Sequence, residues 1–266
     1  MLGKVMKYEF MALGRVLWPL YGGFVALAVV NRVLFALPSE LAGLFIVFGG
    51  GLAVLALIGI IGITFVLIIL RFWKNLMSTE GYLMMTLPAS VDSIILGKLF
   101  VTAIASIACS VILIASGFLM ISFEGVFELF FGSIAKAVGE AFADNPGRVI
   151  LIALEGLLYL ALSTTTFILL IYACLSLSML VQKRRGLFAF GAFLVISTIV
   201  QIISIFVFSF GTVADSYIGI SDFANAMSGY GLFQAVAVTA IVYQTCLSAA
   251  YYFITRFMLK NKLNLL

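Results

Sequence analysis

The sequence contains no histidine, and only 10% of its 266 residues are charged. Histidine is the commonest metal ligand and the side chain best suited to move protons near neutral pH, so its absence argues against a histidine-dependent membrane enzyme. The three cysteines, Cys109, Cys174 and Cys246, lie far apart within apolar runs and lack metal-ligand spacing. We therefore expect neither a metal site nor catalytic activity in this chain.

Apolar residues dominate what is present. They make up 64% of the chain, and the mean hydropathy is +1.27. A typical soluble domain is about 45–50% apolar and about 25% charged. A soluble fold cannot bury this much apolar surface, so lipid must cover part of it. The composition predicts an all-α polytopic membrane protein with one transmembrane domain over residues 1–266.

Six apolar runs are long enough to cross a bilayer, which requires about 20 residues. The predicted spans are residues 16–37, 44–70, 94–121, 149–181, 187–210 and 232–255. Pro19 then lies in the first turn of a span, where its missing N–H is tolerated. Residues 1–15 are basic and amphipathic, although Glu9 interrupts the apolar stripe. They predict a cytosolic interfacial helix, with a helical extension of the first span as the alternative.

The distribution of basic residues predicts the topology. With both termini in the cytoplasm, twelve of the 15 Lys and Arg residues lie inside, and only Arg32, Lys136 and Arg148 lie outside. Cytoplasmic loops of membrane proteins carry this excess of positive charge. We expect a multi-pass protein of the cell membrane, of bacterial origin, with both termini cytoplasmic.

A helix is also expected on the outer surface between the third and fourth spans. Residues 123–146 place apolar side chains at helical spacing, with Glu124 and Glu128 opposed to them. The segment ends at the turn signal Asp144-Asn145-Pro146-Gly147. This pattern predicts a helix that lies on the outer leaflet.

Two ionisable residues fall inside predicted spans, where charge is costly and often functional. Arg32 is near the outer end of the first span, and Glu155 is near the outer end of the fourth. The two are predicted to pair in the outer half of the bundle. Two roles stay open for them, a stabilising contact and a gate or substrate contact.

The chain lacks the phosphate-binding pattern GxxxxGK[ST], which holds nucleotide phosphates in many ATPases. The nearest text, Leu96-Gly97-Lys98-Leu99, has neither the upstream glycine nor the hydroxyl residue. We expect no nucleotide-binding domain, and no ATP hydrolysis by that route.

One cytosolic segment, residues 71–93, carries a pattern between the second and third spans. Its order is a basic and aromatic helix end at 71–74, Glu80-Gly81, an apolar piece, Leu87-Pro88-Ala89-Ser90, and then Leu96-Gly97-Lys98 in the next span. The segment resembles the loop between the second and third helices of type-2 ABC transporter permeases, the transmembrane subunits of ABC exporters. The rest of the chain is similar to that family only in its hydropathy.

The resemblance implies that residues 71–93 form a coupling segment that docks on a separate cytosolic ATP-binding subunit. The implied coupling residues are Lys74, Glu80, Gly81, Tyr82, Met85 and Pro88. Glu80 would pair with a basic residue of that subunit, and Tyr82 and Met85 would supply apolar contact area. Pro88 would set the angle at which the chain re-enters the membrane.

The same resemblance implies the wider assembly. A second copy of the chain or a homologous permease would complete the path through the lipid, and ATP and Mg would be bound in the partner subunit. The expected function is export of an amphipathic or hydrophobic substrate, such as a peptide, an antibiotic or a lipid, with no nucleic-acid partner. Two alternatives stay open: a non-transporting membrane scaffold or immunity protein, and a secondary transporter.

Overall fold

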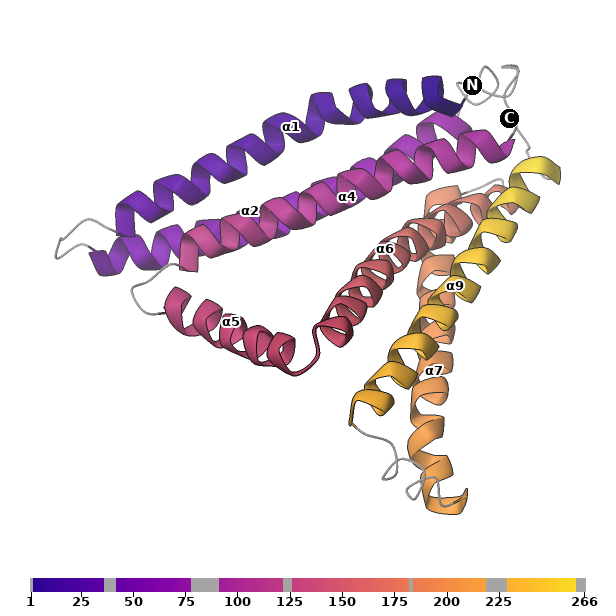
Figure 1. Ribbon diagram of the computed structural model, residues 1–266. Coiled ribbons are helices and arrows are strands. Elements are labelled where there is room, and N and C mark those ends of the chain that lie inside the picture. Colours follow the sequence, from indigo (N-terminus) through magenta and orange to yellow (C-terminus); the bar gives the residue numbers. More distant parts are fainter. Residues whose placement is uncertain are drawn as a thin grey trace. The chain divides into compact units, whose positions relative to one another are not determined.

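The computed structural model describes residues 2–35, 42–77, 91–121, 126–181, 184–218 and 229–261, and within these ranges all regular structure is helical (Figure 1). The elements are α1 (Leu2–Phe35), α2 (Ala42–Met77), α4 (Val91–Ile121), α5 (Val126–Asp144), α6 (Pro146–Leu177), the short 3₁₀ helix η1 (Ser178–Leu180), α7 (Arg185–Ile218) and α9 (Gly229–Asn261). The expected all-α class is therefore confirmed.

Six of these helices are long and apolar enough to cross a membrane, as the sequence predicts. The qualifying stretches are Met6–Leu34, Phe48–Lys74, Val91–Phe118, Pro146–Leu180, Arg185–Val207 and Phe233–Lys260. The chain groups into two compact units. The first comprises residues 1–74 and 87–154, and the second comprises residues 75–86 and 155–266.

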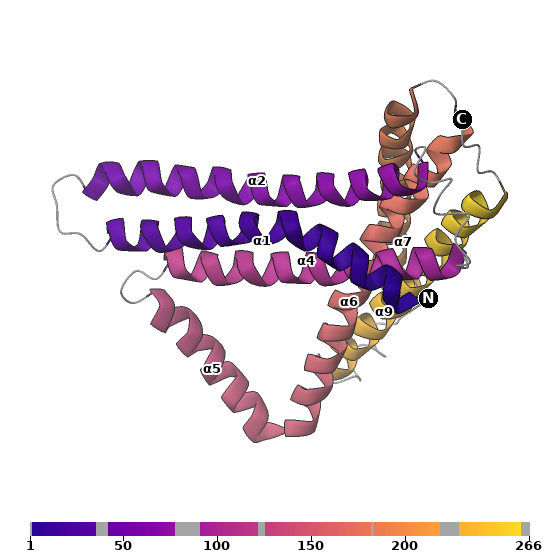
Figure 2. The same ribbon diagram turned by 90° about the horizontal axis from the view of Figure 1, so that it is seen from above.

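Residues 2–15 belong to the same helix as the first span. Helix α1 runs unbroken from Leu2 to Phe35, so the alternative of a helical extension is the one observed (Figure 2). Pro19 consequently lies inside the helix and not in its first turn. It removes one backbone hydrogen bond there. Leu17 and Tyr21, on either side of the proline, are buried in one cluster, and this packing holds the helix through the missing bond.

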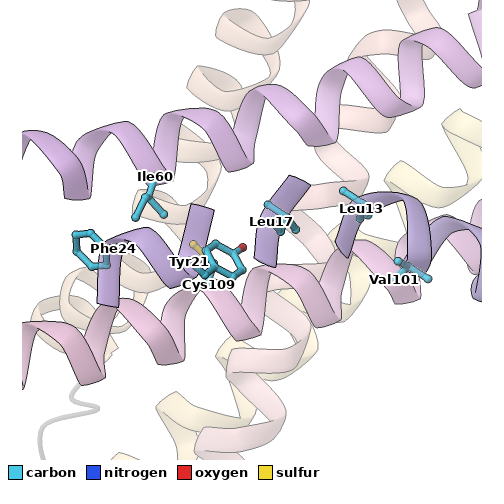
Figure 3. Packing of buried hydrophobic residues seen from close by; sticks show 7 residues of the cluster. All are labelled: Leu13, Leu17, Tyr21, Phe24, Ile60, Val101 and Cys109. Atoms are coloured by element: carbon cyan, nitrogen blue, oxygen red, sulfur yellow. The ribbon is translucent and has the colours of Figure 1, made fainter. Parts of the chain in front are cut away.

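The core of the first unit lies where α1 packs against α4 and α2 (Figure 3). The buried cluster comprises Leu13, Leu17, Tyr21 and Phe24 of α1, Ile60 of α2, and Val101 and Cys109 of α4. The α1 members recur every three or four residues, so they occupy one face of that helix. The hydroxyl of Tyr21 also donates to the carbonyl oxygen of Ala105 at 3.3 Å. Together these contacts fix the register of α1 against α4.

The predicted helix between the third and fourth spans is present as α5, and it ends at the predicted turn. Asn145 separates α5 from α6, and its side-chain Oδ1 accepts a hydrogen bond from the N–H of Arg148 at 3.3 Å. Asn is a favoured residue just before a helix, and Pro146 occupies the first helical position, where proline is tolerated. The rings of Phe118 and Phe131 lie 4.9 Å apart and join α4 to α5.

In the second unit, the C-terminal half of α6 is the most buried stretch. Tyr172, Ala173 and Ser176 are almost entirely covered. Hydrogen bonds connect the helices of this unit: Thr166 of α6 donates to the Gln244 carbonyl at 3.3 Å, Tyr243 of α9 donates to the Val200 carbonyl of α7 at 3.1 Å, and Gln234 of α9 donates to Glu155 of α6.

Candidate functional site

A buried carboxylate of α1 is bound by one cation from α2 and one from α4. Nη1 of Arg71 donates to Oε2 of Glu9 at 2.8 Å. Nζ of Lys98 donates to the other oxygen, Oε1, and forms a second ion pair. We call Glu9, Arg71 and Lys98 the ionic cluster. It joins the three long helices of the first unit through one side chain.

The ionic cluster is largely shielded from solvent. Glu9 is 6% exposed and Lys98 is 3% exposed, whereas the side chain of Arg71 remains partly accessible. A buried charge is tolerated only when it is paired, and removing one partner of such a pair is strongly destabilising. The three groups therefore hold one another in place, and the ends of α1, α2 and α4 that carry them are expected to move together.

The helical face of α1 explains why Glu9 is buried. Glu9 precedes Leu13 by four residues and Leu17 by eight, so it continues the buried stripe of α1 toward the N-terminus. The interruption of the apolar stripe is thus the residue that forms the ion pairs. Sequence reasoning missed this role, although an acidic residue on an otherwise apolar face was the available signal.

One cation of the cluster begins the predicted coupling segment, and the other follows the end of the segment. Arg71 is the first residue of the segment, and Lys98 belongs to the Leu96-Gly97-Lys98 pattern that follows it. Residues 71–77 continue α2, and residues 91–93 begin α4. Glu9 therefore joins α1 to both helices from which the coupling segment extends.

Of the predicted coupling residues, only Lys74 lies within the described ranges, where it is exposed on α2. The others, Glu80, Gly81, Tyr82, Met85 and Pro88, lie outside the residues that the structure describes. Their role as the contact with an ATP-binding subunit stays a prediction. What the structure adds is the anchoring of the two helices on either side of them.

Arg32 and Glu155, which the sequence predicts to pair, belong to different units of the chain. Arg32 is exposed on α1 in the first unit. In the second unit, Oε1 of Glu155 accepts a hydrogen bond from Nε2 of Gln234 on α9. Among the residues that the structure describes, Oε2 of Glu155 and Oε1 of Gln234 are buried without a hydrogen-bond partner. The pairing with Arg32 stays a prediction, and Gln234 is the neighbour that sequence reasoning did not assign to Glu155.

The cysteines are unpaired; Cys109 and Cys174 are buried, and Cys246 is exposed. In the ranges that the structure describes, no three Cys, Asp or Glu side chains gather closely enough to hold a metal ion.

No protein-family model matches the chain, and no curated protein or solved structure matches it either. Its function is therefore inferred from its own residues and from the resemblance of residues 71–98 to the permease loop.

Proposed function

We propose that the chain is the transmembrane permease subunit of an ATP-driven exporter. The observation that supports this most is the ionic cluster, in which Glu9 of α1 binds Arg71, at the start of residues 71–93, and Lys98, five residues after their end. A permease without its own ATPase must receive force through a compact cytosolic contact. Helices that end at such a contact need a rigid connection to the rest of the bundle, and the ionic cluster supplies one.

In this proposal, residues 71–93 dock in a groove of the ATP-binding subunit. Glu80 pairs with a basic residue there, while Tyr82 and Met85 supply apolar contact area. When the ATP-binding subunits close, they push on the segment and thereby on α2 and α4. Because Glu9 is bound to Arg71 and Lys98, α1 follows. ATP binding then shifts the equilibrium between inward-facing and outward-facing arrangements of the bundle.

The proposed topology places this contact in the cytosol. Both termini are cytoplasmic, and twelve of the 15 basic residues lie on that side of a bacterial cell membrane. The permease domain comprises residues 1–266, with α5 on the outer surface. The sequence contains no phosphate-binding loop, so ATP and Mg belong to the partner subunit. A second copy of the chain, or a homologous permease, completes the assembly.

The alternatives differ in what they require of the acidic residues. A secondary transporter would be expected to carry paired acidic residues at mid-membrane or a repeat with broken helices. Glu9 is already bound by two cations, which favours a structural connection over ion binding at that position. A scaffold or immunity protein would need no ATP-binding partner at all, so contact with such a partner separates it from the proposal.

The contact can be tested by site-directed photo-crosslinking. A photoreactive amino acid replaces Tyr82, and a matched variant carries it at Lys136, an exposed position of α5 on the predicted outer surface. After illumination of intact cells, the Tyr82 variant is expected to crosslink to a protein that contains a phosphate-binding loop, and the Lys136 variant is not. If the Tyr82 variant captures no ATP-binding protein, the proposal is wrong.

A further inference from the structure

The second unit contains a groove of about 450 Å³ between α6, α7 and α9. Sites for small molecules commonly have volumes of about 300–1,000 Å³. All three helices contribute polar side chains to the lining: Tyr159, Ser163 and Thr166 from α6, Ser204 from α7, and Tyr243, Gln244 and Tyr251 from α9. The hydrogen bonds that these polar groups already make decide which of them can bind a ligand.

Four of these hydroxyls are already engaged by the backbone. Ser163 donates to Leu160 at 3.0 Å, Thr166 to Leu162 at 2.7 Å, Ser204 to Gln201 at 2.8 Å, and Tyr243 to Val200 at 3.1 Å. Hydroxyl groups in helices commonly bond back to a carbonyl of the preceding turn in this way. These hydroxyls can still accept a hydrogen bond, but each already donates its proton to a backbone carbonyl.

Three polar side chains of the lining are not engaged: Tyr159, which is exposed, and Gln244 and Tyr251, which are more covered. Within the part of the chain that the structure describes, neither the hydroxyl of Tyr251 nor the side-chain amide of Gln244 makes a hydrogen bond. Tyr251 is only 5% exposed. The polar atoms of both side chains are absent from the buried atoms that lack a partner, so these atoms remain accessible at the groove that the two residues line. Tyr251 and Gln244 can therefore form hydrogen bonds with a molecule that enters the groove.

The remaining lining limits the chemistry of that molecule. None of the described residues that line the groove is charged, and Phe167, Leu170 and Leu247 add apolar surface to it. A charged ligand would lose its hydration there without gaining a counter-ion. A tyrosine hydroxyl and a glutamine amide can each donate and accept. They suit a headgroup that does both, such as a hydroxyl or an amide.

We propose that the groove binds an uncharged amphipathic molecule, with a hydroxyl or amide headgroup held by Tyr251 and Gln244 and a hydrocarbon part against Phe167, Leu170 and Leu247. As the cargo site of an exporter, this assignment rests on the function proposed above and narrows its substrate class to uncharged amphipaths. As a ligand site, it rests on the groove alone, because α6, α7 and α9 form it without the ionic cluster.

The test is photoaffinity labelling of the purified full chain in detergent. The probe is a monoacylglycerol with a diazirine in its acyl chain, and two comparison probes carry the same chain on a carboxylate and on a quaternary ammonium group. The monoacylglycerol is expected to label residues of the groove on α6 and α9 in peptide mass spectrometry. Each charged probe is expected to label them at least about tenfold less.

Variants distinguish labelling in the groove from non-specific labelling of the detergent-covered surface. At probe concentrations below saturation, Tyr251→Phe and Gln244→Leu should each lower labelling about fivefold. This is the ordinary effect of one lost hydrogen bond. Thr245→Val is the matched control, since Thr245 is exposed on α9, does not line the groove and bonds to the Ile241 carbonyl. Ser204→Phe places a large side chain in the groove from α7. It should abolish labelling although Tyr251 is unchanged.

Labelling spread evenly over all apolar helices, and unchanged in these variants, would overturn the ligand site. Equal labelling by the charged probes would overturn the assigned ligand class. If the groove binds the probe as expected but Tyr82 crosslinks to no ATP-binding subunit, the ligand site stands and the exporter proposal fails. The two results are thus distinguishable.

Discussion

Lys98 of α4 donates to Glu9 of α1, and the two residues are 89 positions apart in the sequence. Both are almost entirely buried, and Arg71 of α2 binds the second oxygen of the same carboxylate. A contact of this kind makes three helices dependent on one side chain. It also lies beside the segment through which we propose that force enters the bundle.

Removing the Glu9 carboxylate alone should lower stability more than removing Glu9 and Lys98 together. Glu9→Leu leaves Lys98 buried without its partner, and it should lower the free energy of unfolding by about 3 kcal/mol. The double variant Glu9→Leu/Lys98→Met removes both buried charges, and Arg71 can reach water, so it should be more stable than Glu9→Leu alone. Thermal unfolding in detergent provides the measurement, with Lys7→Met, an exposed position on α1, as the control. A double variant less stable than the single one would contradict the assigned pairing.

Adjacent positions on α1 should differ sharply in their sensitivity to truncation. Leu17 is buried in the cluster between α1 and α4, whereas Val16 is exposed on the same helix. Leu17→Ala should lower the free energy of unfolding by about 2 kcal/mol through the cavity that it leaves. Val16→Ala should cost less than about 0.5 kcal/mol, since it removes no buried contact. Equal losses in the two variants would mean that this face of α1 does not pack against α4.

Glu155 and Gln234 should show energetic coupling. Their hydrogen bond predicts that Glu155→Ala and Gln234→Ala are non-additive in stability, by roughly 0.6 kcal/mol for a bond at membrane depth. The same cycle with Arg32→Ala in place of Gln234→Ala tests the predicted pair of Arg32 and Glu155. Strict additivity in the first cycle would argue against the contact with Gln234, and strict additivity in the second would argue against the pair with Arg32.

The proposed topology can be measured by cysteine labelling in intact cells. In a variant that lacks Cys109, Cys174 and Cys246, single cysteines replace Lys136 of α5 and, separately, Lys7 of α1. A maleimide that does not cross membranes should label position 136 in intact cells and position 7 only after permeabilisation. Labelling at position 7 in intact cells would reverse the orientation and would place the predicted coupling segment outside the cell.

The sequence was sufficient to predict the helices but not their contacts. The six apolar runs and the Asn145-Pro146 break were readable, because span length and turn residues act locally. The sequence did not decide between an interfacial helix over residues 1–15 and a helical extension of the first span. The role of Glu9 becomes clear only when its ion-pair partners are known. Those partners lie 62 and 89 positions away, where no local pattern points to them. The groove could not be predicted from the sequence either, because Tyr251 and Gln244 of α9 line it together with residues of α6 and α7 that are distant in the sequence.

Coupling to a separate ATPase is the central claim, and purification of the assembled complex tests it most directly. Tagged wild-type chain should bring down a subunit with a phosphate-binding loop, and in vesicles that complex should hydrolyse ATP faster when the monoacylglycerol is added. The Glu80→Ala/Tyr82→Ala variant should insert into the membrane normally yet lose most of this stimulation. A chain that purifies without any ATP-binding subunit, or a variant whose stimulation equals that of the wild type, would contradict the proposed coupling.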